Sequence, residues 1–160
     1  MKQLTKEYIT NRAENILKQY SNAMYPIAIV DIAEKLGLIV KKAQFSKTDI
    51  AGMLNRQDKT IYVAESDNMG RRRFSIAHEI GHYVLHEDEK YISYRDNIST
   101  LGFDIKEVEA NFFAANLLMP EKEIKALYNA NYTLENMSHY FAVSRAAVGF
   151  RLKSLGLDNE

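Results

Sequence analysis

Hydrophobic residues recur at intervals of three and four over much of this chain, the spacing that places them on one face of an α-helix. Residues 5–20 show this spacing and are predicted to form a first helix. A second helix is predicted over residues 26–37, because Pro26 suits a first helical turn and Gly37 suits the position just after a helix.

Three short segments have the composition of β-strands instead. Residues 38–42 are rich in β-branched side chains, and residues 50–54 and 60–64 flank the turn-like sequence NRQDK. We expect these segments to form a small, antiparallel, three-stranded sheet.

Helical spacing dominates the rest of the chain. A residue among 66–68 is expected to cap a long helix that runs to about His86, and a very apolar helix is expected over residues 104–119. Residues 87–104 show no period and are interpreted as a loop or lid. Three shorter helices are predicted over residues 121–129, 134–141 and 144–154.

The predicted fold is therefore α+β, with the small sheet packed among helices. A length of 160 residues favours a single domain, residues 1–160. Within it, residues 133–155 resemble a helix-turn-helix.

Composition narrows the classes of function. The 21 basic and 21 acidic residues cancel, so no global field would attract DNA or an anionic membrane. The chain has no cysteine, which excludes disulfides, thiolate zinc ligands and a cysteine nucleophile. The N-terminus has scattered charges, and no apolar run approaches the roughly 18 residues of a membrane span. We therefore expect a cytoplasmic protein.

Candidate catalytic and metal-binding residues lie in the sequence HEIGH, residues 78–82, within the long helix predicted to end near His86. His78 and His82 would lie about 40° apart around the helix and roughly 6 Å apart along it, so both rings can bind one metal ion. Glu79 is rotated by about 100° from His78, where it can hold a water molecule and take its proton. This division of labour is typical of a metal-dependent hydrolase. The alternative is an ordinary helix face that happens to carry histidine.

The surroundings of this motif favour a site. Hydrophobic neighbours such as Ile76 and Ile80 would bury the helix, so its ionisable groups need partners. Gly81 costs a helix about 1 kcal/mol relative to alanine, which indicates that another segment packs closely against it.

A third metal ligand is expected from the apolar helix predicted over residues 104–119. Glu107 and Glu109 lie about 200° apart on it and cannot face the same way. Glu109 shares a polar stripe with Lys106 and Asn116, whereas Glu107 falls on an apolar side with Asn111. We therefore predict that Glu107 binds the metal and that Asn111 fixes the outer nitrogen of a ligating histidine. The alternative is that Glu107 pairs with a basic residue.

Two segments carry a family resemblance. RRRFSIAHEIGHYVLH at residues 71–86 and EVEANFFAANLLMP at residues 107–120 resemble the ImmA/IrrE family of metallopeptidases. The family pattern is R-x-F before H-E-x-x-H, then E-x-x-A-N-x-F-A-x-x-L-L-M-P, and no position departs from it. The upstream segments PIAIVDIAEKLGLIV and AGMLNRQDKTIYV are similar to the family's N-terminal helix and hairpin. The resemblance covers roughly residues 25–155.

The resemblance implies a zinc-dependent endopeptidase with a zincin-like active-site helix. His78, His82 and Glu107 would bind one Zn²⁺ per chain, and Glu79 would be the catalytic glutamate. Asn111 takes the place of a histidine-orienting aspartate found in other zinc peptidases. The implied substrate is a helix-turn-helix repressor, which would make the protein an anti-repressor that regulates transcription.

A substrate of this kind leads to an expectation about the sheet. Extended peptides bind many proteins by adding to a sheet edge. We therefore expect one of the strands 50–54 and 60–64 to be an exposed edge beside the zinc.

Other polar residues carry weaker signals. His86 lies about 12 Å along the helix from His78, too far to share one ion, and is interpreted as a helix-end residue. His139, Tyr94 and His86 stay open as oxyanion partners. For the arginines at 71–73 a solvated face or salt bridges are favoured over contact with substrate, and Phe74 is expected in the core.

The C-terminal helices raise the question of DNA binding. Thr133 and Ser144 are plausible N-caps, and a tight turn is expected at residues 142–144. The second helix offers Arg145, Arg151 and Lys153, but residues 133–160 hold three basic and three acidic residues. A structural or partner-docking role is favoured over direct DNA binding.

Two alternatives to a peptidase remain. One is a metal-stabilised regulatory module that binds a repressor or DNA without cleavage, although a structural site needs no catalytic base such as Glu79. The other is a hydrolase of a small-molecule amide, because the motif specifies water activation and not substrate size.

Overall fold

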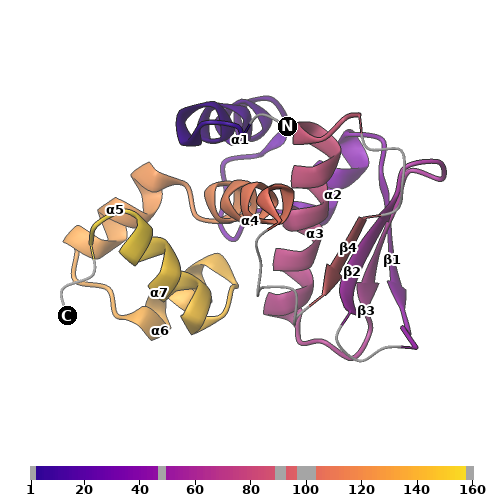
Figure 1. Ribbon diagram of the computed structural model, residues 1–160. Helices are drawn as coiled ribbons and strands as arrows, with labels where there is room; N and C mark the ends of the chain where they lie inside the picture. Colours follow the sequence, from indigo (N-terminus) through magenta and orange to yellow (C-terminus); the bar gives the residue numbers. More distant parts are fainter. Residues whose placement is uncertain (1–2, 47–49, 89–92, 97–103, 158–160) are drawn as a thin grey trace.

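Helices and a small sheet make up the computed structural model, which describes residues 3–46, 50–88, 93–96 and 104–157 (Figure 1). The α+β class is confirmed. In chain order the elements are α1 (Lys6–Tyr20), α2 (Ile29–Lys35), β1 (Ile39–Ala43), β2 (Ile50–Asn55), β3 (Thr60–Ala64), α3 (Met69–Leu85), β4 (Ser93–Asp96), α4 (Ile105–Leu118), α5 (Glu121–Asn129), α6 (Leu134–Phe141) and α7 (Arg145–Ser154).

Side-chain caps explain where most of these helices begin. The capping side chain accepts a hydrogen bond from a backbone N–H of the first turn, which would otherwise lack a partner. Such caps are Thr5, Asn68, Asp104, Thr133 and Ser144.

The second helix begins later than predicted, at Ile29 instead of Pro26. It has no side-chain cap, and Ile27 is buried just before it. Its end is as predicted: Gly37 has φ +89°, and the N–H of Leu38 bonds the Ala33 carbonyl at 2.9 Å. This is the arrangement in which glycine commonly ends a helix.

The sheet differs from the expected three antiparallel strands. In the described part of the chain four strands lie in the order β1-β3-β2-β4, and β1 runs parallel to β3 while the other pairs are antiparallel. The additional strand, β4, falls in the segment interpreted as a loop or lid. It has only four residues, too few to show a period, and is held by its pairing with β2. The flanking residues 89–92 and 97–103 lie outside the described residues.

This order also makes the expectation of an edge at β2 or β3 wrong, because both strands are internal. The edge strands are β1 and β4. Of these, β4 pairs with β2, the strand that packs against α3.

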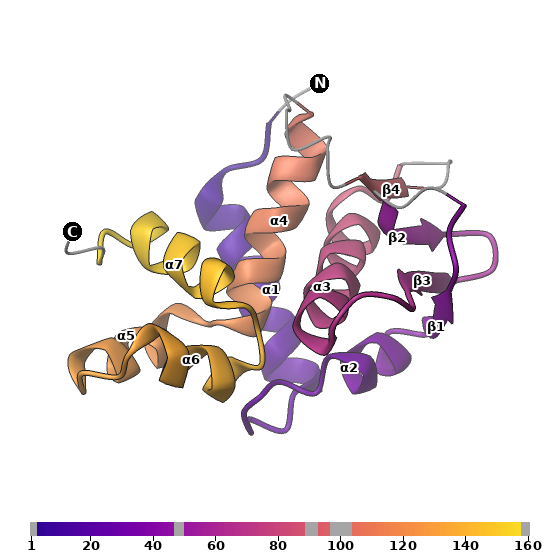
Figure 2. The same cartoon turned by 90° about the horizontal axis from the view of Figure 1, so that it is seen from below.

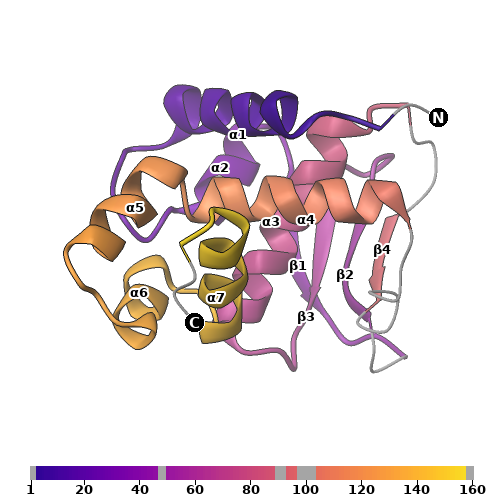
Figure 3. The ribbon, with the colours of Figure 1, turned by 60° about the vertical axis from the view of Figure 1, so that its left-hand side comes forward.

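The helix α3 forms the centre of the molecule. It packs against β2 and β3 on one side and against α4 on another, while α1 lies along α4 (Figure 3). The helices α5, α6 and α7 gather at the end of the molecule away from the sheet (Figure 2). Among the described residues, no helix is both long and apolar enough to cross a bilayer.

The predicted close packing at Gly81 is confirmed. A Cβ added there would lie 3.2 Å from both the Ala110 carbonyl oxygen and the Phe113 ring. The two long helices therefore approach each other closely at the turn that carries the histidines.

Candidate metal centre

The helices α3 and α4 bring three predicted ligands together. The Nε2 atoms of His78 and His82 lie 3.2 Å apart. Glu107 reaches both rings, with its Oε1 3.1 Å from His78 Nε2 and its Oε2 2.6 Å from His82 Nε2. Both histidines are buried, whereas the Glu107 side chain is 19% exposed.

This cluster has the composition and dimensions of a metal site. One ligand atom from each residue lies within 4.8 Å of the others. In a tetrahedral zinc site with bonds of about 2.0–2.1 Å, ligand atoms are separated by about 3.3 Å. Two imidazoles and a carboxylate at these separations therefore fit such an ion.

Electrostatics keep Glu107 ionised. Burial alone would raise its pKa, but hydrogen bonds and charge from His78 and His82 outweigh this effect and lower the pKa to about 2. A carboxylate that stays ionised at neutral pH is the form that binds a metal.

The two remaining predicted site residues lie on the same two helices as the cluster. Asn111 Oδ1 lies 2.8 Å from His78 Nδ1, so the predicted contact between Asn111 and the outer nitrogen of a histidine is present. Glu79 is fully buried on the face of α3 that meets the sheet. A Cβ added to Gly52 of β2 would lie 3.5 Å from its Oε2, so a glycine in β2 leaves room for the Glu79 carboxylate.

Comparisons with known proteins agree with this geometry. Residues 33–153 match the Peptidase_M78 family, described as the IrrE N-terminal-like domain. The chain belongs to this family.

Relatives of this IrrE N-terminal-like chain carry names related to peptidases and to phage immunity. It is 26% identical over 160 residues to the metallopeptidase ImmA of Bacillus subtilis (strain 168), covering 95% of this chain and 88% of the relative. It is 30% identical over 84 residues to the uncharacterized immunity region protein 2 of Bacillus phage phi105, covering 52% of each.

The fold is shared with solved structures. A transcriptional regulator of Mycobacterium tuberculosis superposes with a TM-score of 0.69 at 19% identity, over 91% of this chain. The match spans 46% of the regulator's length.

The sequence did not predict the burial of two residues of this family member. His86 is the C-cap of α3, as its interpretation as a helix-end residue predicts, and Glu109 was expected in a polar stripe. Both are buried, and His86 Nε2 lies 2.8 Å from Glu109 Oε1. The other ring nitrogen of His86, Nδ1, lies 2.9 Å from His82 Nδ1. The available signal was the spacing of four from His78 through His82 to His86.

One of the arginines at 71–73 is exposed to solvent, and the other two make contacts within the protein. Arg71 is exposed and lies 3.9 Å from an Asp67 carboxylate oxygen, as a salt bridge predicts. Arg72 donates to the carbonyls of Glu65 and Asp67. Arg73 donates to the carbonyls of Ala142 and Phe141, and burial lowers its pKa. The last contact joins α3 to the turn between α6 and α7.

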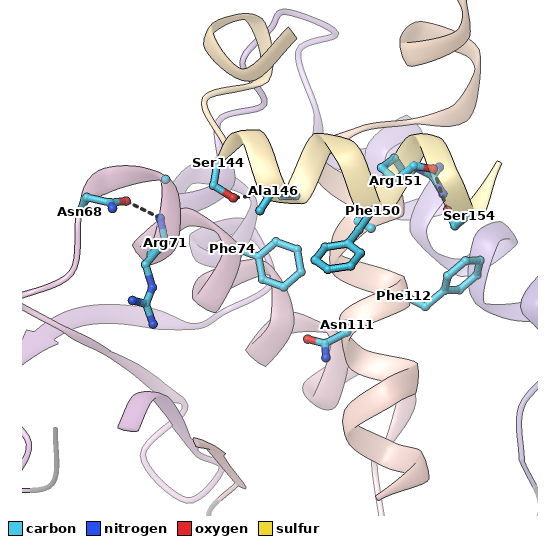
Figure 4. A pocket seen from close by; sticks show the side chains of 13 residues that line it. Asn68, Arg71, Phe74, Asn111, Phe112, Ser144, Ala146, Phe150, Arg151 and Ser154 are labelled. Atoms are coloured by element: carbon cyan, nitrogen blue, oxygen red, sulfur yellow. Dashed lines mark hydrogen bonds between the residues drawn. The ribbon is translucent and has the colours of Figure 1, made fainter. Parts of the chain in front are cut away.

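An apolar groove of about 560 Å³ lies between α3, α4 and α7 (Figure 4). Asn111, the partner of His78, lines one end of it. Phe74, expected in the core, is only half-buried and lines the groove with Phe112 and Phe150. Phe150 is 74% exposed, so the groove presents a large apolar surface.

The C-terminal helices form with the predicted caps and turn. Of the three basic residues considered for DNA, Arg151 is buried and holds the protein together instead. It donates to the Met119 carbonyl at 3.0 Å and to Asn116 Oδ1 at 3.1 Å. Burial lowers its pKa to about 10.

The oxyanion partner stays a prediction. His86 is buried and in contact with His82, which argues against this role for it. His139 is exposed on α6, and the side chain of Tyr94 lies outside the described residues.

Proposed function

We propose that this chain is a zinc-dependent endopeptidase. The observation that carries the proposal is the cluster of His78, His82 and Glu107, with the buried carboxylate of Glu79 on the same helix as the two histidines. In this proposal these three residues hold one Zn²⁺ per chain. Two histidines and a glutamate make up the protein ligands of several zinc peptidases.

The roles of the other residues follow from their positions. Zinc supplies polarisation of the scissile carbonyl and makes a water molecule more acidic. Glu79 takes the proton of that water and returns it to the leaving amine nitrogen. Asn111 holds the His78 ring in one orientation by accepting a hydrogen bond from its Nδ1.

Two surfaces near this centre favour a polypeptide substrate over a small amide. The edge strand β4 lies on β2, and an extended peptide can pair with such an edge. The groove lined by Phe74 and Phe150 offers apolar surface for side chains, and it reaches Asn111, the partner of His78. A small amide would use neither surface.

The specific substrate we propose is a helix-turn-helix repressor. The names of the relatives, a metallopeptidase and an immunity region protein, support a role in the control of an integrated element. A DNA-bound repressor as substrate goes with a cytoplasmic location. Cleavage of it would make the chain an anti-repressor.

Metal dependence tests this proposal directly. The purified protein should hold about one zinc per chain and cleave a co-purified repressor. Chelation should abolish cleavage, and added zinc should restore it. Cleavage that survives complete removal of metal, verified by elemental analysis, would rule the proposal out.

A further inference from the structure

We propose that His86 and Glu109 are positioning residues, which fix the ring of His82 for metal binding. The inference rests on the proposed function, because it takes His82 as a metal ligand. It starts from a row of short contacts that runs from His82 through His86 and Glu109 to the backbone of Leu4.

With the proposed zinc ion bound, the protons along this row can be assigned in one consistent way. His82 Nε2 faces Glu107 and His78, so it offers its lone pair to an ion and the ring proton lies on Nδ1. That proton can be donated to His86 Nδ1, 2.9 Å away. His86 then carries its own proton on Nε2, 2.8 Å from Glu109 Oε1. Each ring stays neutral, and each contact has one donor and one acceptor.

The far end of the row is fixed by the backbone. Glu109 Oε2 accepts the N–H of Leu4 at 2.7 Å, just before α1 begins. Because His82, His86 and Glu109 are each at most 4% exposed, water competes little for these hydrogen bonds. The segment before α1 is thereby linked to the metal centre.

The two proposed histidine ligands are thus oriented by different means. His78 Nδ1 meets the amide of Asn111, whereas His82 Nδ1 meets a second imidazole that leads to a carboxylate. A carboxylate at the end of such a series makes the ligating nitrogen a better electron donor. The affinity of the site for zinc should therefore depend on His86 and Glu109, and their role should go beyond packing against His82.

Zinc affinity measured by competition with a chelator tests this inference. His86→Ala and Glu109→Ala should each raise the zinc dissociation constant by about 10–100-fold, the usual cost of losing such a partner. Glu109→Gln should lie between wild type and Glu109→Ala, because its amide oxygen still accepts from His86.

The matched control is Asn116→Ala. It removes another buried hydrogen bond of α4, the one to Arg151, without touching the metal centre. It should lower the melting temperature while leaving zinc affinity near that of wild type. If His86→Ala and Glu109→Ala bind zinc no more weakly than Asn116→Ala, the row is only structural and the inference is wrong.

A second readout needs no activity. In zinc-loaded protein, ¹⁵N shifts of the imidazoles should show His82 with its proton on Nδ1 and His86 with its proton on Nε2, and Glu109→Gln should mix the tautomers of His86. A wild-type His86 protonated on Nδ1 would contradict the inference even if His86→Ala did not fold. Glu107→Ala separates the two proposals: if it too leaves zinc affinity unchanged, the proposed metal centre itself fails.

Discussion

The carboxylate of Glu107 contacts two histidines, with one oxygen close to each ring. Its pKa is lowered to about 2 from an ordinary value of 4.5, because the gain from these contacts exceeds the cost of burial. The ionised side chain therefore contributes to folding stability as well as to the site.

This contribution has a defined pH window in metal-free protein. A group whose pKa is lower in the folded state stabilises above its unfolded pKa and loses that effect as the pH falls. The difference in the free energy of unfolding between wild type and Glu107→Gln should be constant above about pH 4.5 and should shrink as the pH falls towards about 2. Urea unfolding between pH 6 and pH 3 measures it. A difference that does not change over this range would contradict the assignment.

The same residues show what a sequence does and does not predict. The clustering of His78, His82, Glu107 and Asn111 was predictable because spacing within each helix fixes which side chains share a face. The burial of Glu109 was not, because periodicity does not say what covers a face. The side of α4 that carries it is polar, yet Leu4 and His86 bury it.

The close approach of α3 to α4 depends on Gly81. The backbone of Gly81 is ordinarily helical, so glycine is needed there because it has no side chain and not because of its conformational freedom. The helices meet there because a glycine leaves room for the Ala110 carbonyl and the Phe113 ring. Glycine is otherwise unfavourable within a helix by about 1 kcal/mol.

Alanine at two helical glycines should therefore have opposite effects. Gly81→Ala should destabilise the protein by about 1–3 kcal/mol, because backbone must move to admit the methyl group. Gly149→Ala in α7 should stabilise it by about 0.5–1 kcal/mol, since nothing lies within 4 Å of the added atom. Thermal unfolding of both variants checks the pair. Equal effects on stability would mean that the close contact at Gly81 does not exclude an added methyl group.

The sheet was the element least predictable from sequence. Strand direction has no local signal, so the parallel pairing of β1 with β3 could not be foreseen. The strand β4 is short and contains Ser93, Tyr94, Arg95 and Asp96, so neither its length nor its composition marks it. It forms because β2 offers it a backbone partner.

The whole molecule combines zero net charge with C-terminal helices that are fixed to the rest of the protein. Arg73 joins α3 to the turn before α7, and Arg151 joins α7 to the end of α4. Residues 133–155 hold two capped helices joined by a turn, and Arg151, one of the basic residues considered for DNA binding, makes internal contacts instead.

We therefore predict little direct binding to DNA. Fluorescence anisotropy with a labelled duplex at physiological salt should show no affinity beyond the weak non-specific range, about 10⁻⁴ M or weaker. Replacement of Arg145 and Lys153, both exposed on α7, should change nothing. Tight binding that weakens with salt and is lost in these variants would show that α7 contacts DNA.

The most direct test of the proposed peptidase is Glu79→Gln, which keeps the size of the side chain but removes its ability to take a proton. Zinc content and melting temperature should stay near those of wild type, and cleavage of a co-expressed neighbouring repressor should fall by about 10²–10⁴-fold. Wild type should give repressor fragments where the variant leaves the repressor intact. Relief of repression by both proteins, with no fragment from either, would contradict the account and show a protein that acts by binding.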